Sequence, residues 1–203
     1  MKLPDELVVA TGNPGKLAEL SELLTPLGIT IRSPGELGWE PSTPEEGETL
    51  EMNAVTKARE AVRATGLAAL ADDSGLFVNA LGGVPGVHSA RYAGEAQDPL
   101  ANCAKLLGAL EGVPPGERGA EFRCVIALVD SEGNEQIFSG VCRGRIGTEP
   151  RGEKGFGYDP VFVSGDGRTF AEMDSMTKHR ISHRGRALEA LRAYLAPDSE
   201  DSC

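Results

Sequence analysis

The chain has 203 residues, of which 40% are hydrophobic and 25% charged, and its formal net charge is −11. This composition is typical of a globular protein with one sizeable core, and the negative charge argues against a nucleic-acid polymer as a partner. No apolar run approaches the roughly 20 residues that span a bilayer, and the first residues show no signal-peptide pattern, so we expect a cytosolic protein that does not bind membranes.

The first half of the chain alternates strand and helix patterns. A short apolar run stops at a Gly-Asn-Pro-Gly turn, and apolar residues at helical spacing follow it. Further on, an apolar run leads into Asp72-Asp73-Ser74-Gly75, where we expect a strand to end. We expect strands at 7–11, 29–31, 67–70 and 76–78 and helices at 16–24 and 52–65, with a loop at 33–49.

The second half opens with an irregular, glycine-rich stretch that is too long for a simple connection and is therefore a functional candidate. Two strand patterns around a Ser-Glu-Gly-Asn turn predict an antiparallel hairpin. Ser182 is a candidate cap for the last helix. After the irregular stretch 79–98, we expect helices at 99–110 and 182–195 and strands at 121–129, 136–145 and 161–163. A glycine-rich loop covers 144–157, and 197–203 is a frayed acidic tail. The pattern indicates the α/β class with a mixed sheet.

The segment Thr11-Gly12-Asn13-Pro14-Gly15-Lys16 lies between a predicted strand and a predicted helix. Loops in this position direct backbone N–H groups and the positive end of the helix toward anions. Lys16 adds a charge, so the segment is a candidate phosphate site, although Asn-Pro-Gly is also ordinary turn chemistry. It is not a P-loop, because the loop is too short and Leu17 follows the lysine.

Two acidic segments could together hold a divalent metal. Asp72 and Asp73 follow a strand pattern, and side chains of neighbouring strand residues point to opposite faces, so one carboxylate could face a cleft. Such a carboxylate could bind Mg²⁺ or accept a proton from water. Upstream, Glu45, Glu46 and Glu48 lie in one loop. The alternative interpretations are an Asx turn for the aspartates and solvated side chains for the glutamates.

Two later segments could bind the remainder of a nucleotide. Gly155-Phe156-Gly157-Tyr158-Asp159-Pro160 places two aromatic residues and an aspartate among glycines, in a chain with only 5% aromatic residues. An aromatic face can stack on a flat base. The run 178–186 is basic in an otherwise acidic chain and could bind phosphates or a base edge. The alternatives are aromatic residues packed in the core and a helix start with a solvated basic face.

Taken together and in this order, the segments resemble one family. The order is TGNPGK, an acidic EEG loop leading into a helix with NA…KAR, LADDSGL, LGGVPGVHSARYAG, GFGYDPVF and SHRGRAL. It is similar to that of the inosine/xanthosine triphosphate pyrophosphatases, and the match spans residues 7–195. The resemblance implies an elongated mixed β-sheet flanked by helices, with two lobes and a central cleft, as a single domain over 1–196. It also implies a homodimer that cleaves ITP, dITP and XTP between the α- and β-phosphates with Mg²⁺.

The resemblance also implies a role for individual residues. Asp73 would be the general base and a metal ligand, with Glu45 favoured over Glu46 as the second ligand, because Gly47 follows Glu46 directly where the family often has one more residue. The substrate would be bound by Thr11, Gly12, Asn13, Pro14, Gly15, Lys16, Lys57, Ser74, Phe156, Gly157, Tyr158, Asp159, Lys178, His183 and Arg184.

Two other functions stay open at the level of sequence. The first is a Maf-like pyrophosphatase of modified pyrimidine nucleotides, which a substrate panel would distinguish. The second is a nucleotide-binding regulator without catalysis, which would release no pyrophosphate. The set of carboxylates argues against the regulator.

Overall fold

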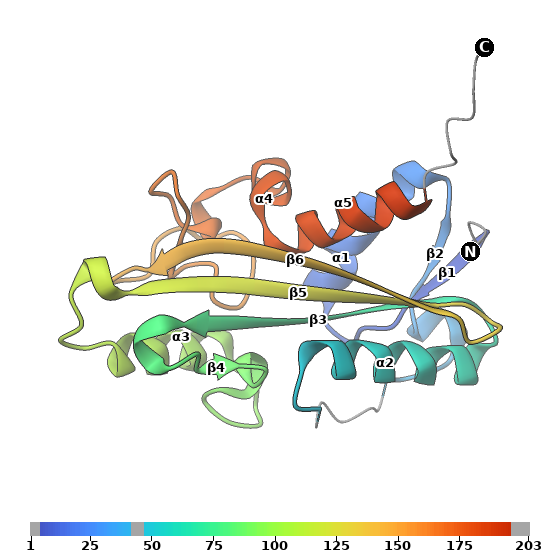
Figure 1. Cartoon of the computed structure of the whole chain (residues 1–203), viewed down its shortest axis with the longest axis horizontal. Coiled ribbons are helices and arrows are strands. Elements are labelled where there is room, and N and C mark those ends of the chain that lie inside the picture. The colour runs from blue at the N-terminus through green and yellow to red at the C-terminus, as the bar shows by residue number, and fades with distance from the viewer. Residues whose placement is uncertain (1–4, 42–46, 196–203) are drawn as a thin grey trace, which may run out of the picture.

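In the computed structural model, which describes residues 5–41 and 47–195, a seven-stranded mixed sheet runs the length of the molecule (Figure 1). The strand order is β2-β1-β3-β5-β6-β7, with β4 beside β3. Strands β1, β2 and β3 pair in parallel, and the other pairs are antiparallel. The strands are β1 (Glu6–Val9), β2 (Thr30–Arg32), β3 (Ala69–Val78), β4 (Pro85–Gly86), β5 (Gly119–Val129), β6 (Glu135–Ile146) and β7 (Phe162–Val163).

Helices cover both faces of this sheet. Figure 1 shows α1 and α5 on one side of the long strands and α2 on the other. The helices are α1 (Pro14–Leu24), α2 (Leu50–Thr65), α3 (Pro99–Ala109), α4 (Ser175–Ile181) and α5 (His183–Leu195), and the short 3₁₀ helices are Thr25–Leu27, Gly35–Leu37, Asn79–Leu81, Ser89–Arg91, Pro115–Glu117 and Phe170–Glu172. The predicted α/β class and mixed sheet are confirmed.

Strand alternation assigns the two faces of the sheet to different cores. Leu70 on β3 packs with Ile126 on β5 and with Leu188 on α5. Their sequence neighbours face the other way, so Ala71 joins the alanine stripe of α2. A third cluster, around Phe162 and Phe170, forms the core at the far end of the long strands. All three clusters pack on the same sheet, two of them near α1, α2 and α5 and the third, the distal cluster, around Phe162 and Phe170. We therefore propose one domain of two lobes. Residues 196–203 lie outside the described residues.

The predicted break between 70 and 76 is wrong. Strand β3 continues through Asp72-Asp73-Ser74-Gly75, because each of its residues from Ala69 to Val78 pairs with β5. A sequence that reads as a turn is therefore held extended by its neighbour strand. The hairpin β5–β6 is confirmed, with Val129 opposite Glu135 at its turn end.

Helix α4 is absent from the predicted elements. Asp174 caps it by accepting from the Thr177 N–H, and Ser182, with extended backbone angles, ends it. The Ser182 Oγ then accepts from the Gly185 N–H, which confirms Ser182 as the cap of α5. A Cβ at Gly185 would lie 1.7 Å from the His179 carbonyl oxygen, so glycine allows the two helices to meet this closely.

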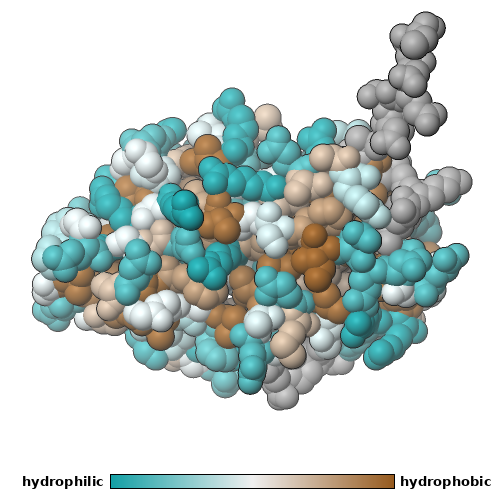
Figure 2. All heavy atoms as spheres, viewed as in Figure 1, coloured by the Kyte–Doolittle hydropathy of each residue, from teal (hydrophilic) through white to brown (hydrophobic). Residues whose placement is uncertain are grey.

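On the face shown in Figure 2, hydrophilic residues are interspersed with smaller groups of hydrophobic ones. Among the described residues, none of the helices combines the length and the apolar character needed to cross a bilayer.

Candidate functional site

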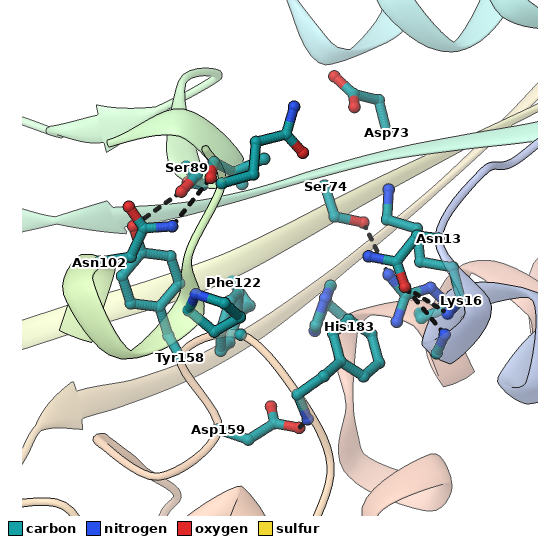
Figure 3. A pocket seen from close by; sticks show the side chains of 18 of the residues that line it. Asn13, Lys16, Asp73, Ser74, Ser89, Asn102, Phe122, Tyr158, Asp159 and His183 are labelled. Atoms are coloured by element: carbon teal, nitrogen blue, oxygen red, sulfur yellow. Dashed lines mark hydrogen bonds between the residues drawn. The ribbon is translucent and has the colours of Figure 1, made fainter. Parts of the chain in front are cut away.

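A cavity of about 530 Å³ opens beside the middle of β3 (Figure 3). On this edge of β3, strand β1 pairs as far as Leu70 and β4 begins pairing at Leu76. The edge between them faces the cavity, which also lies beyond the carboxyl end of β1, where ligands bind in open α/β sheets. The lining comes from distant segments of the sequence, among them Gly12–Lys16, Asp73–Gly75, Ser89 and Ala90, Phe156–Asp159, and the trio Lys178, His183 and Arg184.

The first segment begins α1. The Asn13 side-chain oxygen accepts from the backbone N–H groups of Gly15 and Lys16, at 2.9 and 3.1 Å, and caps the helix. These two N–H groups are therefore already bonded, and an anion here would meet the Lys16 ammonium or displace the cap. Gly12 to Lys16 line the cavity, whereas Thr11 is not among the lining residues and its hydroxyl accepts from the Asn13 N–H.

Asp73 lies on the α2 face of β3 and lines the cavity. Its Oδ1 is 3.1 Å from the Lys57 ammonium, and its Oδ2 accepts from the Asn53 amide at 3.0 Å. Asn53 and Lys57 are one helical turn apart on α2, as the sequence predicts, so both reach the same carboxylate. Lys57, which the resemblance places at the substrate, thus contacts Asp73 but does not line the cavity itself.

Asp72 points to the opposite face and is the centre of a buried charge cluster, a role that the sequence did not assign to it. Its Oδ2 accepts from the Arg184 Nε and Nη2 at 3.2 and 3.1 Å and lies 3.2 Å from the Lys16 ammonium. Ser74 donates to the same oxygen. The Asp72 carbonyl oxygen also accepts from Lys57 at 2.8 Å.

Burial alone would raise the pKa of the Asp72 carboxyl. The cations Lys16 and Arg184 outweigh that effect and hold the pKa well below its usual range, so Asp72 is ionised at neutral pH. The same pairing raises the pKa of Arg184 against the lowering effect of burial. Lys16 and Arg184 are therefore fixed beside the cavity by a carboxylate that does not line it.

Lys178 and Arg184 of the basic run are buried, whereas Arg180 and Arg186 are exposed. The Lys178 ammonium lies 2.7 Å from both Glu19 and Asp159, and Glu19 also accepts from Arg184. Burial raises the pKa of Asp159, and Lys178 limits that rise. Asp159 also accepts from the Phe156 N–H at 2.9 Å, so it holds its own loop in place.

The Phe156 ring forms an aromatic wall of the cavity, and two cationic side chains lie beside it. The Lys178 ammonium is 4.9 Å and the Arg184 guanidinium 5.6 Å from the centre of its ring. Gly15 also approaches the ring: a Cβ there would lie 2.7 Å from Phe156 Cδ1. The loop that holds Gly15 and the loop that holds Phe156 are far apart in sequence, yet they meet in one wall of the cavity.

His183 lies on the cavity wall against Phe122, with ring centres 4.6 Å apart. Burial, together with the cations Arg184 and Lys178, moves its pKa well below the ordinary value. His183 is therefore neutral at neutral pH, with one ring N–H donor and one acceptor.

The stretch 79–98 forms the opposite wall. Tyr158 donates to the Ser89 carbonyl at 2.8 Å, and Asn102 on α3 donates to the Ala90 carbonyl and accepts from the Ala93 N–H. The stretch therefore has a structural purpose that the sequence had left open. Sequence reasoning missed several residues of the site, because nothing in the local pattern distinguishes them from core and helix residues: Glu19, Asn53, Asn102 and Phe122.

Of the two carboxylates that the sequence predicts as metal ligands, Asp73 is described and Glu45 lies outside the described residues. The structure groups no three His, Cys, Asp or Glu residues as a metal cluster within 5–41 and 47–195. Mg²⁺ is usually held by one or two carboxylates together with substrate phosphates. Asp73 fits that pattern, and the predicted partner Glu45, like Glu46, lies outside the described residues.

Comparison with known proteins identifies close relatives. The model of the Ham1 family matches residues 7–194. The dITP/XTP pyrophosphatase of Desulforamulus reducens is 52% identical over 185 residues, which cover 91% of this chain and 92% of that protein. That of Geobacter sulfurreducens is 52% identical over 190 residues, covering 93% and 96%. The solved structure of a HAM1 protein from Coxiella burnetii, 47% identical, superposes with a TM-score of 0.84 and covers 94% of this chain and 98% of that chain.

Proposed function

This chain belongs to the Ham1 family, and from that premise we propose that it is a nucleoside triphosphate pyrophosphatase acting on ITP, dITP and XTP. The products would be the nucleoside monophosphate and pyrophosphate. The observation that carries the proposal is that Lys16, Asp73 and Phe156 line one cavity, although they come from three distant segments.

The phosphates belong at the Lys16 and Asp73 end of this cavity. Lys16 offers a charge at the start of α1, and Lys57 lies against Asp73. Asp73 would accept the proton of a water molecule as the water oxygen bonds to the α-phosphorus and the bond to the bridging oxygen breaks. Pyrophosphate then leaves. Phosphoryl transfer asks mainly for positioning and charge neutralisation, which these side chains supply.

Mg²⁺ is the proposed cofactor, with Asp73 and Glu45 as its ligands. When bound, it would neutralise charge on the phosphate oxygens. The donor chemistry of Asp73 suits it, because Mg²⁺ prefers carboxylate and phosphate oxygens.

The base belongs at the other end, between Phe156 and the wall that carries His183. A site whose buried donors are left unpaired by the wrong base discriminates strongly. A 6-oxo group accepts a hydrogen bond and a 6-amino group donates one, so donors at this end favour hypoxanthine and xanthine over adenine. Neutral His183, Arg184 and backbone N–H groups are the proposed donors.

The test is steady-state kinetics with pyrophosphate detection, with and without Mg²⁺, on ITP, dITP, XTP, GTP, ATP, dTTP and UTP. Preferential turnover of the first three, dependent on Mg²⁺, is expected. Comparable turnover of ATP would defeat the specificity, preference for the pyrimidine nucleotides would favour the Maf-like alternative, and nucleotide binding without pyrophosphate release would favour the regulator.

We also propose a homodimer, for which the stretch 79–98 is one candidate surface. Val84 in that stretch is 46% exposed, whereas Tyr92 packs against the distal core. Sedimentation of the wild type and of Val84→Asp at micromolar concentration tests this: a dimer that Val84→Asp weakens supports the proposal, and a monomeric wild type contradicts it.

A further inference from the structure

Asn53 joins two parts of the chain that the proposed reaction needs close together. It lies in the first turns of α2 with 3% of its surface exposed. Its amide nitrogen donates to Asp73 Oδ2 at 3.0 Å, and its amide oxygen accepts from the Gly47 N–H at 2.8 Å. A carboxylate only accepts and a backbone N–H only donates, so these two partners fix which way round the amide lies.

Gly47 approaches this amide more closely than any other residue type could. A Cβ at Gly47 would lie 2.5 Å from the Asn53 Oδ1, so a side chain there would push the amide away. The Gly47 backbone and the Asn53 amide on α2 are therefore in close contact, and Asp73 contacts the other end of the same amide.

We propose that Asn53 is a positioning residue: its amide fixes the orientation of the Asp73 carboxylate relative to the backbone of Gly47. The inference rests on the proposed function, in which Asp73 accepts the proton. Lys57 holds one carboxylate oxygen at 3.1 Å and Asn53 holds the other at 3.0 Å, so the plane of the carboxylate is defined by two donors from one helix face. Removing the amide donor takes away one of these two contacts with the carboxylate.

The competing explanation is that Asn53 only stabilises the start of α2. Thr49 offers a matched control, because its hydroxyl caps the same helix by accepting from the Met52 N–H at 3.2 Å. Thr49→Ala loosens the helix start and removes no contact of Asp73. A structural role predicts similar kinetics for Thr49→Ala and Asn53→Ala, whereas a positioning role predicts a loss of turnover in Asn53→Ala alone.

Asn53→Asp separates the two contacts of the amide. The new carboxylate still accepts from the Gly47 N–H, but it replaces the donor to Asp73 with a like charge. We expect kcat to fall about 10- to 100-fold in Asn53→Asp and in Asn53→Ala, the size of loss that is typical when a hydrogen bond supporting a metal-binding side chain is removed. We expect little change in KM, because Asn53 does not line the cavity.

Amide hydrogen exchange measured by NMR on the nucleotide-free protein gives a second readout. The Gly47 amide should be protected in the wild type and in Asn53→Asp, and exchange faster in Asn53→Ala. The proposal is overturned if Asn53→Asp keeps the wild-type kcat, if its loss appears in KM alone, or if Thr49→Ala loses as much turnover as Asn53→Ala. A wild type that releases no pyrophosphate from any nucleotide instead overturns the proposed function, while the exchange data still judge the contact.

Discussion

Asp72 and Asp73 are neighbours in sequence, yet their carboxylates lie on opposite faces of β3 and have different partners. Asp72 binds Arg184 at 3.1 Å within a buried cluster, and Asp73 meets Lys57 at 3.1 Å at the cavity. The alternation of a strand produces this division. Substitutions of the two aspartates should therefore affect different properties of the protein.

Replacing Asp73 by asparagine should abolish most turnover and preserve nucleotide binding. The amide has a similar shape but cannot accept the proton of the attacking water. General-base catalysis contributes about 10²- to 10⁴-fold, so we expect kcat to fall within that range. Single-turnover kinetics and equilibrium binding of a non-hydrolysable nucleotide measure the two effects. Near-normal turnover would remove Asp73 as the base.

Replacing Asp72 by asparagine should instead destabilise the fold and weaken nucleotide binding. The change leaves the buried Arg184 without its full countercharge, and breaking a buried pair in this way costs about 3–5 kcal/mol. Urea unfolding at pH 7 measures the loss. The exposed pair of Asp166 and Arg168 provides the control, since Asp166→Asn should leave the unfolding midpoint unchanged. Equal midpoints for the wild type and Asp72→Asn would contradict the role of the cluster.

Replacing Gly15 by alanine should raise KM for the nucleotide more than it lowers kcat. The added methyl group would lie 2.7 Å from the Phe156 ring, which Lys178 also contacts at 4.9 Å from its centre, so the aromatic wall must move. A double-mutant cycle with Phe156→Leu checks the cause. The effect of Gly15→Ala should shrink in the Phe156→Leu background; an undiminished effect would locate the cause in the first loop itself.

The stability of the protein should fall as the pH drops below about 6.5, the ordinary value for histidine. His183 has its pKa lowered well below that value when folded, because of burial and of its cationic neighbours, so the unfolded chain binds a proton that the folded chain refuses. The stability is therefore complete above about 6.5 and decreases as pH falls from there toward the folded pKa. Asp72, whose pKa is also lowered, adds its own loss only below about 3.8.

Urea midpoints measured between pH 8 and pH 5 test this dependence in the wild type and in His183→Asn. The variant should show a flatter profile over this range. An unchanged slope would show that the acid sensitivity arises elsewhere.

Much of the fold was predictable because local patterns carry it. The helix over 52–65 appears as α2 (Leu50–Thr65), and the hairpin appears as β5 and β6 with the expected turn. The helix at 16–24 starts two residues earlier, at Pro14, because Asn13 provides the cap. Two errors remain. Strand β3 was divided at Asp72–Gly75, because its pairing with β5 outweighs local propensity. Helix α4, which Asp174 caps, was missed.

The sequence by itself determined the ordered motifs, the class of fold and several of the segments that line the cavity. Only the tertiary structure decided how their charges are paired. Arg184 meets Asp72 across 112 residues and Glu19 across 165, and Lys178 meets Glu19 across 159. A basic run looks solvated in sequence because its partners are far along the chain. Burial of these cations is stable only where folding brings carboxylates to them, since an unpaired buried charge is far too costly to persist.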